Sequence, residues 1–399
     1  MPKHFLIIGA GFSGLVLAER LSSQLGARCT IVEKRDHIGG NAQDEYDAAG
    51  VLVHKYGPHY FRTNSPRIRE YLSRFTEWHQ VDYRILSYSD GRYWNFPINL
   101  NTFEQILGRE STTEEFESWL AEKRVPIENP ANSEEVIISQ VGWELYEKFF
   151  KNYTLKQWKK HPRELDASVC GRIPARTNRD DRYLREEFQA LPKEGYHRMF
   201  ERMLEASPGV EVLMNTDYRE VVGSIPHDHL IYTGAIDDYF DFCFGPLPYR
   251  SLRFEKESFS AEQLVEREPI SGKPGFWQPA MQVNYPNDEE YTRIVEIKHA
   301  TGQECSNTTI VREYPDDYEA GKEAYYPIPT SETAALYQKY AEKGAALPNV
   351  SFVGRLATYR YYNMDQVVGM ALTEFEKLKE KWGVEGMEVE GQIRKYTGG

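Results

Sequence analysis

The chain has 399 residues, enough for two or three structural units around a large core. Its 48 basic and 61 acidic residues give a net charge of −13, which argues against a general nucleic-acid-binding surface and means that an anionic ligand would need a local arginine cluster. The four cysteines are widely spaced and no apolar run reaches the ~18 residues of a membrane span, so we expect a cytoplasmic protein without a metal centre, disulfide framework, membrane anchor or nucleic-acid partner.

The N-terminus has the pattern of a nucleotide-binding βαβ unit. An apolar run over 5–8 predicts a strand buried on both faces. Gly9, Gly11 and Gly14 then match G-x-G-x-x-G, with glycines for the tight turn, for backbone approach to a pyrophosphate and for close helix packing. The N–H groups at the start of the following helix would face the phosphates. The next predicted strand ends in Glu33, about 20 residues after the third glycine, where a carboxylate can accept both hydroxyls of an adenosine ribose.

Other interpretations of this stretch remain open. A glycine-rich turn without a ligand would show the same spacing, and a secretory signal is a second alternative, although a Glu-Arg pair follows without an A-x-A-like cleavage site. Lys34 is either a cofactor contact or, with Arg35, part of a solvated face. The Gly39-Gly40 pair just past the acid is a turn common in flavoproteins that have this unit.

The rest of the chain predicts elements in a clear order. These are a helix over 64–77, strands over 81–98 with a turn at 90–91, a helical region over 102–161, a strand at 210–213, a strand-rich region over 240–330, a last strand at 350–355 and a helix over 364–382. Residues 56–63 combine glycine, proline and polar aromatics, which is typical of a loop held against a ligand but also of a packed turn.

This alternation predicts an α/β fold, with a Rossmann-like cofactor domain interrupted by a helical bundle and an antiparallel β-sheet domain. The expected boundaries are 1–80, 195–240 and 340–385 for the cofactor domain, 100–170 for the helical bundle, 81–99, 171–194 and 241–339 for the sheet domain, and 386–399 for a tail.

Three stretches, 149–158, 172–183 and 352–366, combine basic residues with aromatics. Rings can stack on a flat base, and guanidinium groups bind phosphates through paired hydrogen bonds. A second nucleotide could therefore bind here, although solvated arginines and core aromatics would give the same composition. The candidates are Arg172, Arg293, Tyr183, Tyr326 and Tyr361.

Five motifs resemble the bacterial UDP-galactopyranose mutase family, in that family's order and spacing over about residues 4–375. They are Y-G-P-H at 56–59, Y-T-x-K-Q-W at 153–158, R-I-P-x-R at 172–176, T-R-I-V-E at 292–296 and G-R-L-A-T-Y at 354–359. The resemblance implies an FAD-binding domain, a helical bundle with a mobile substrate lid and an antiparallel sheet. It also implies a redox-neutral mutase that interconverts pyranose and furanose forms of a nucleotide-diphosphate sugar, in which N5 of the reduced flavin forms a covalent adduct with the anomeric carbon.

The resemblance also implies roles for individual residues. The family's two diphosphate-binding arginines are matched by Arg172 and Arg293, and its phosphate-binding tyrosines by Tyr183, Tyr326 and Tyr361. The aromatic site for the base is matched by Phe149 or Phe150 together with Tyr153, and the ring on the lid by Trp158. Two positions near the flavin are matched by His59 and Arg62. The cofactor candidates are Gly9, Gly11, Phe12, Ser13, Gly14, Glu33, Lys34, Gly40, Asn41, Tyr56, Gly57, His59, Arg355, Asp365 and Gln366. Asp365 has an alternative role as a helix N-cap, and His59 as a packed turn residue.

The chain departs from the family at Tyr60 and Arg62, where the family loop usually reads G-P-H-I-F-H-T. A permanent cation in place of histidine would change which sugar substituent is accepted. UDP-galactose therefore remains one candidate substrate beside 6-deoxy, N-acetylated, dTDP- and GDP-linked sugars. We expect an unidentified reductant, a possible homodimer and a role in supplying furanose units for a surface polysaccharide or a natural product. Alternative functions are an amine oxidase-like flavin oxidoreductase and a non-catalytic nucleotide-sugar-binding protein.

Overall fold

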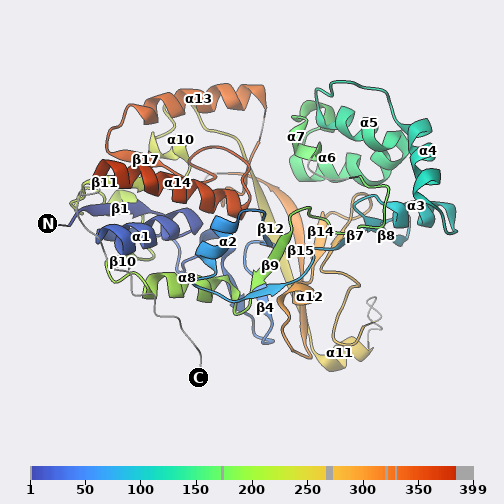
Figure 1. Cartoon of the computed structure of the whole chain (residues 1–399), viewed down its shortest axis with the longest axis horizontal. Helices are drawn as coiled ribbons and strands as arrows, with labels where there is room; N and C mark the ends of the chain where they lie inside the picture. The colour runs from blue at the N-terminus through green and yellow to red at the C-terminus, as the bar shows by residue number, and fades with distance from the viewer. Residues whose placement is uncertain (1, 172–174, 267–272, 320–321, 329, 383–399) are drawn as a thin grey trace.

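The computed structural model describes residues 2–171, 175–266, 273–319, 322–328 and 330–382. Three parts follow one another along the molecule: a parallel sheet covered by helices, a second sheet, and a group of helices at the far end (Figure 1). The α/β fold with a Rossmann-like domain is therefore confirmed. Within the described residues, none of the helices has both the length and the apolar character that a membrane crossing requires.

The first part is built on a five-stranded parallel sheet. Its order is β10 (Val210–Leu213), β2 (Arg28–Val32), β1 (His4–Ile8), β11 (His229–Tyr232) and β17 (Val350–Phe352). Phe5 and Ile7 point into the main hydrophobic core while Leu6 and Ile8 join a separate cluster on the opposite face. Because both faces are buried, the strand reads as a continuous apolar run in the sequence.

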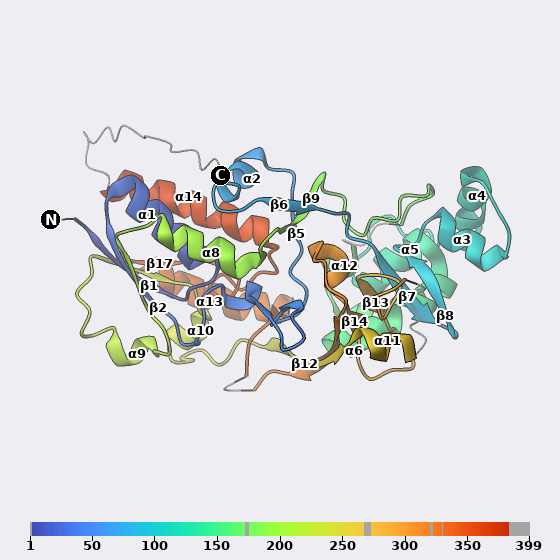
Figure 2. The same ribbon diagram turned by 90° about the horizontal axis from the view of Figure 1, so that it is seen from below.

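Helices cover both faces of this sheet (Figure 2). α1 (Phe12–Leu25), α8 (Gly195–Glu205) and α14 (Met364–Trp382) lie on one face, and α9 (Tyr218–Val221), α10 (Ile236–Tyr239) and α13 (Ser331–Ala345) lie on the other. The apolar stripe of α1, which includes Leu15, Ala18 and Leu21, is buried against α14 and the sheet. This packing fixes the N-terminus of α1 at the carboxyl edge of the sheet.

The second part is a seven-stranded sheet in the middle of the molecule. Its order is β16 (Tyr326–Pro327), β12 (Tyr249–Phe259), β15 (Thr308–Asp317), β14 (Arg293–Val295), β13 (Gln282–Asn284), β7 (Ile85–Ser89) and β8 (Arg92–Phe96), with α11 (Ala261–Glu266) and α12 (Lys298–Thr301) in its connections. Every neighbouring pair is antiparallel except β13 and β7. The predicted turn between β7 and β8 is present, since Asp90 and Gly91 have φ of 54° and 74°, as a type I′ hairpin requires.

Short elements connect the two sheets. They are η1 (Gly40–Ala42), the hairpin of β3 (Asp44–Tyr46) and β4 (Leu52–His54), helix α2 (Pro66–Leu72), and a three-stranded sheet of β5 (Phe61–Thr63), β9 (Phe188–Pro192) and β6 (Trp78–Gln80). The helix predicted over 64–77 ends five residues early, because the chain must leave it before β6 pairs with β9.

The third part consists of helices between β8 and β9. These are α3 (Leu100–Leu107), α4 (Thr113–Lys123), α5 (Ser133–Tyr146), the π-helical turn η2 (Glu147–Lys151), α6 (Asn152–Trp158), η3 (Pro162–Glu164) and α7 (Ser168–Gly171). Asn99, Thr112 and Asn132 cap α3, α4 and α5, each accepting a hydrogen bond from the backbone N–H three residues later. The π-turn just before α6 is of interest because such turns often mark functional sites.

Candidate functional site

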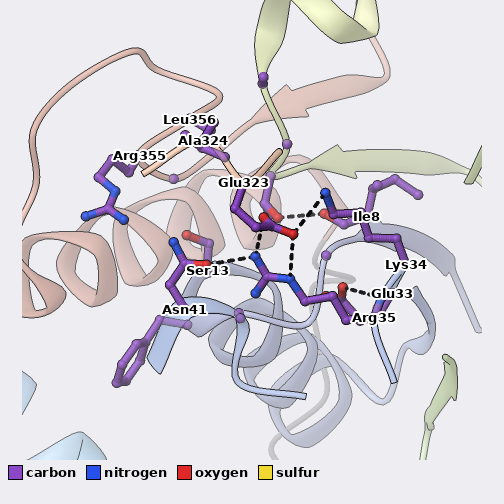
Figure 3. A pocket seen from close by; sticks show the side chains of 18 of the residues that line it. Ile8, Ser13, Glu33, Lys34, Arg35, Asn41, Glu323, Ala324, Arg355 and Leu356 are labelled. Carbon is purple, nitrogen blue, oxygen red and sulfur yellow. Dashed lines mark hydrogen bonds and ion pairs between the residues drawn. The ribbon is translucent and has the colours of Figure 1, made fainter. Parts of the chain in front are cut away.

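A cavity of about 520 Å³ opens at the carboxyl ends of β1, β2 and β11. Strand order changes direction here, since β2 lies on one side of β1 and β11 on the other, and this is where open α/β sheets bind ligands. The close-up in Figure 3 shows side chains from the first strands, from the segment around Glu323 and from the Arg355 loop converging on this space.

Two glycine turns line part of the cavity. A Cβ on Gly40 would lie 3.0 Å from Cα of Gly11, so the two glycine turns face each other closely. Gly11 precedes α1 and provides no side-chain cap, and the first turn of α1 contains no acidic residue. The first-turn N–H groups therefore remain available to a phosphate.

Glu33 forms the acidic end of the cavity. Its buried carboxylate accepts hydrogen bonds from the backbone N–H of Ala10 at 2.8 Å and of Arg35 at 3.0 Å. A carboxylate has about four acceptor sites, so Glu33 is fixed in place and can still accept ribose hydroxyls. Glycine turns, free helix N–H groups and a fixed carboxylate together match the needs of a dinucleotide such as FAD.

Arg35 belongs to this site, and its interpretation as part of a solvated face was wrong. Its side chain is only 13% exposed, and Nη2 donates to Glu323 Oε2 at 2.6 Å and to Asn41 Oδ1 at 2.8 Å (Figure 3). The guanidinium also lies 4.5 Å from the ring centre of Tyr56. Lys34, by contrast, is 65% exposed, with Nζ 3.5 Å from Glu323. The ion pair to Glu323 therefore joins the first βαβ unit to the segment that follows β15.

His59 lies where the cavity approaches the second sheet. Its Nδ1 is 3.0 Å from the Gly57 carbonyl, and its backbone N–H donates to His54 Nδ1 at 3.0 Å. Burial lowers the pKa of His59 to about 4, against the hydrogen bond to Gly57, and the nearby Arg355 and Arg293 cations lower it further. The ring is therefore neutral at pH 7, with its proton on Nδ1 and the lone pair of Nε2 free.

The buried imidazole of His54 makes stability depend on pH. Burial lowers the pKa of this 4%-exposed ring to about 3, whereas an unfolded histidine titrates near ~6.5. Between these values the unfolded chain binds a proton that the native chain does not, so stability is complete above about pH 6.5 and is lost as the pH falls. We expect His54 alone to cost on the order of 2 kcal/mol between pH 7 and pH 5.

Urea unfolding at pH 7 and at pH 5 would measure this loss. His54→Gln keeps an acceptor for the His59 N–H but does not titrate, so its midpoint should fall less on acidification than that of the parent. The exposed His227→Gln serves as the control. Equal losses in the parent and His54→Gln would contradict the assignment.

Arg293 begins β14, opposite Glu313 on β15. Its Nη2 donates to Glu313 Oε2 at 2.7 Å, and both side chains are largely buried. Burial lowers the pKa of Arg293, but the Glu313 carboxylate and the hydroxyls of Tyr153, Tyr326 and Tyr83 outweigh it, so the net shift is upward. Arg293 Nε and Glu313 Oε1 are buried without a hydrogen-bond partner, which is unusual outside functional sites.

Three aromatic side chains gather beside Arg293. The ring centre of Tyr326 lies 5.3 Å from that of Tyr361 and 6.3 Å from that of Trp158, and Trp158 lies 6.4 Å from Tyr361. Arg355, which lines the cavity, lies 5.5 Å from the ring centre of Tyr326. Trp158, Tyr326 and the segment from Arg355 to Tyr361, which are far apart in the sequence, are thus brought together next to the cavity.

Comparison with known proteins agrees with this arrangement. The family model described as UDP-galactopyranose mutase matches residues 148–361, and one described as an NAD(P)-binding Rossmann-like domain matches residues 7–75. The chain is 36% identical over 376 residues to a probable UDP-galactopyranose mutase of Klebsiella pneumoniae, covering 93% of each, and 33% identical to a dTDP-fucopyranose mutase of Escherichia coli, covering 92% of this chain and 96% of that one. A crystal structure of reduced UDP-galactopyranose mutase superposes with a TM-score of 0.74 at 17% identity, covering 96% of this chain and 94% of that one.

The chain belongs to the UDP-galactopyranose mutase family. It is accordingly a mutase of the isomerase class that acts on the pyranose and furanose forms of a nucleotide sugar. Its cofactor is FAD. The expectations of family, enzyme class and cofactor are confirmed.

Most of the predicted cofactor residues line the cavity of this mutase. They are Gly9, Gly11, Phe12, Ser13, Glu33, Lys34, Gly40, Asn41, His59 and Arg355. Gly14 packs directly against the backbone of Gly9, where a side chain would not fit. The Tyr56 ring lies against the guanidinium of Arg35, and its hydroxyl is 2.7 Å from His37 Nε2. Gly57, Asp365 and Gln366 are not among the cavity-lining residues.

Sequence reasoning missed the segments that complete the mutase cavity. They are residues 216–219, 233–235, 318 and 322–324, together with Leu356, Tyr362, Met364 and Val367. Thr233 and Gly234 follow the apolar strand β11 directly, so the strand-then-glycine signal used at Gly9 could have found them. Leu356 lies within the G-R-L-A-T-Y motif and was overlooked there, whereas residues 216–219, 318 and 322–324 carry no local motif.

The predicted substrate residues have different surroundings. Phe149 and Phe150 are buried in an aromatic core with Phe96, where Phe149 is 3% exposed, while Tyr153 is half-buried near Arg293. The Tyr183 ring lies 5.5 Å from that of Tyr83, which neighbours Arg293. Arg172 lies outside the described residues.

Arg62 and Asp365 lie together beside the start of α14. Arg62 Nε is 3.0 Å from Glu186 Oε1, and the side chain is largely buried on β5. Asp365 is the second residue of α14, so the alternative role as an N-cap was wrong. Burial raises its pKa, against hydrogen bonds from Gln366 and Thr63 and the nearby Arg62 charge.

Proposed function

We propose that the protein interconverts the pyranose and furanose forms of UDP-galactose or a related UDP-, dTDP- or GDP-linked hexose at a reduced FAD. The placement of Arg293 beside His59, within reach of the FAD cavity, is the observation that best supports this. When bound and reduced, the flavin supplies a nucleophilic nitrogen for the anomeric carbon, and the sugar ends at its original oxidation level.

In this proposal Arg293 holds the diphosphate and offsets the negative charge that grows as the sugar leaves it. Its Nη2 is oriented by Glu313, while the buried Nε–H has no partner and can donate a hydrogen bond to a phosphate oxygen. The upward pKa shift keeps the guanidinium charged at every working pH. Arg172 is proposed for the same task on the basis of the family resemblance.

The aromatic cluster of Trp158, Tyr326 and Tyr361 has a different role in this proposal. Burial raises the pKa of Tyr326 to about 12, so its hydroxyl keeps its proton and can donate to a phosphate oxygen. Tyr361 is proposed as a second hydroxyl donor, and the Trp158 ring as a cover that excludes water from the sugar. We propose Tyr183 and Tyr153, with Phe149 or Phe150, for the phosphate and base ends of the same nucleotide.

For the cofactor, we propose that the glycine turns and the α1 N-terminus hold the FAD pyrophosphate and that Glu33 holds the adenosine ribose. His59 and Arg355 would then lie at the flavin end. Asp365 and Gln366, in the first turn of α14, are proposed for the same end.

Turnover is expected only with reduced flavin. The dithionite-reduced protein should convert a nucleotide sugar to its furanose form under anaerobic conditions, whereas the oxidised protein should give no product. Chromatography of the nucleotide sugars after incubation measures both. A panel of UDP-galactose, UDP-N-acetylgalactosamine, dTDP-fucose and a GDP-hexose would identify the preferred substrate in the same experiment.

The alternatives give different results in this assay. An amine oxidase-like enzyme would consume oxygen in proportion to product, and a non-catalytic protein would bind the nucleotide sugar without converting it. Equal conversion by oxidised and reduced protein would contradict the proposed role of the flavin.

We propose that Arg62 influences the choice of sugar. Because Glu186 neutralises its charge and the Asp365 carboxyl lies nearby, we expect a sugar with uncharged substituents to be accepted. Relatives named as UDP-galactopyranose and dTDP-fucopyranose mutases make both sugars necessary members of the panel. Best turnover with UDP-galactose would contradict a changed preference.

We further propose an external reductant for the flavin, a cytoplasmic site of action and a homodimer, none of which depends on the residues named above.

A further inference from the structure

Lys156 lies on α6 between two predicted substrate residues, Tyr153 and Trp158, yet it points away from them to another part of the chain. Its ammonium donates to three backbone carbonyls of the loop between β13 and β14: that of Tyr285, that of Glu289 at 2.8 Å and that of Tyr291 at 3.2 Å. These contacts use all three N–H donors of the ammonium group. Burial lowers the pKa of Lys156 to about 8, partly offset by Glu289 and Asp288.

A second contact holds the same loop to the same helical segment. Asn287 accepts a hydrogen bond from Asn152 Nδ2 at 3.0 Å, and its own Nδ2 donates to the carbonyl of Lys148 at 3.2 Å and to Ser89 Oγ at 3.0 Å. The loop over 285–291 is therefore fixed to η2 and α6 at two points, of which Lys156 is the one with a charge.

This loop leads directly into the diphosphate site. Tyr285 N–H donates to the Thr292 carbonyl at 2.8 Å, and Thr292 N–H donates to the Glu313 carbonyl at 2.8 Å, so the loop closes immediately before Arg293. Arg293 is the first residue of β14, paired with Asn284 of β13 and Glu313 of β15, so the loop joins the strand at this residue. Because β13 and β14 have only three residues each, the anchor of the loop that joins them contributes to the position of Arg293 beside this strand pairing.

The hydrogen bonds of Lys156 join this loop to α6, which carries Trp158. Two residues after Lys156, Trp158 packs near Tyr326 and Tyr361, and the Gln157 carbonyl accepts a hydrogen bond from Arg250 Nε at 3.1 Å. A shift of α6 relative to the 285–291 loop would thus move Trp158 and Arg293 apart.

We propose that Lys156 is a positioning residue that sets the position of Arg293 relative to Trp158 and thereby affects the affinity for the nucleoside diphosphate. This inference rests on the proposed function, since it acts through the diphosphate contact assigned to Arg293. The three hydrogen bonds of the ammonium group all go to backbone carbonyls of the 285–291 loop.

The test uses FAD-loaded protein and titration with UDP or dTDP, whichever the parent binds more tightly. Lys156→Met removes the charge and all three hydrogen bonds, and should weaken diphosphate binding roughly tenfold, as expected for residues of one contact network. KM should rise with it. FAD content should stay the same, and Lys156→Arg should recover part of the affinity because its guanidinium can still reach the loop carbonyls.

Lys151→Met is the matched control. Lys151 lies one turn earlier on the same segment, and its Nζ pairs at the surface with Glu147 at 3.4 Å. It should leave diphosphate affinity within twofold of the parent. An equal loss in Lys151→Met and Lys156→Met would show that any lysine change on this segment disturbs binding, and would overturn the proposal.

A double-mutant cycle with Arg293→Lys decides whether Lys156 acts through Arg293. If it does, Lys156→Met should weaken diphosphate binding much less in the Arg293→Lys protein than in the parent. Fully additive losses would overturn the inference while leaving the proposed function standing. If Arg293→Lys itself leaves binding unchanged, the diphosphate assignment of Arg293 fails instead.

Discussion

Replacing Arg293 by alanine is expected to lower the kcat of the reduced, FAD-loaded protein by roughly 10²–10³-fold, the usual cost of removing one donor to a developing anion. The side chain is largely buried, is paired with Glu313 and has a buried Nε without a hydrogen-bond partner, close to the cluster of Trp158, Tyr326 and Tyr361. FAD content should stay the same, because Arg293 is not among the residues that line the cavity. Initial rates at saturating nucleotide sugar measure the effect.

The control for this prediction is Arg312→Ala. Arg312 lies on the neighbouring strand β15, opposite Ile294, and its Nη1 pairs with Glu257 of β12 at 2.9 Å. The Arg312→Ala substitution removes an arginine side chain from the same sheet but leaves the proposed diphosphate site unchanged. A kcat for Arg293→Ala within a few-fold of that of Arg312→Ala would show that Arg293 does not stabilise the leaving group.

The cofactor half of the site was predictable because its signals are local. The spacing of Gly9, Gly11 and Gly14 reports the turn and the helix start, and Glu33 follows at the end of the next strand. The conformation and position of each of these residues are determined by neighbours within one βαβ unit. Such a unit folds the same way wherever it occurs, so the pattern in the sequence was sufficient.

The partners of Arg35 were not predictable because they come from distant parts of the chain. Glu323 is 288 residues away in sequence and approaches only because β12 and β16 carry its segment back to the parallel sheet. A lysine-arginine pair after a strand is usually solvated, and nothing nearby marked Arg35 as an exception. The same holds for Arg62, whose partner Glu186 precedes β9 and meets it across the three-stranded sheet.

The substrate half was predictable in its members but not in its geometry. The family resemblance indicated Trp158, Tyr326 and Tyr361, and the structure brings these three together. Their motifs could not indicate that Phe149 packs into the core, because the same aromatic residue serves a core and a binding surface equally well. The predicted bounds of the last helix, 364–382, were correct, and they already place Asp365 two positions after the N-cap position.

Gly14→Ala is expected to yield a protein that folds but retains little or no FAD. A Cβ at this position would lie 2.0 Å from the carbonyl oxygen of Gly9 and 3.2 Å from Cγ2 of Ile7. Both contacts are with parts of the molecule that cannot easily yield: the first is backbone in the tight turn after β1, and the second is a buried side chain in the core. The start of α1 must therefore move away from the strand, and its N–H groups move with it, away from the pyrophosphate position.

The FAD-to-protein ratio after gel filtration, read from the visible absorbance of the flavin, measures this loss, and circular dichroism checks that the variant is folded. Gly223→Ala is the matched control, because a Cβ there would meet nothing within 4 Å and its backbone needs no left-handed conformation. If the two variants retain FAD equally, the close approach of α1 to Gly9 is not what holds the cofactor. If only Gly14→Ala loses FAD, and mutase activity falls in the same proportion, turnover depends on the geometry of the turn between β1 and α1.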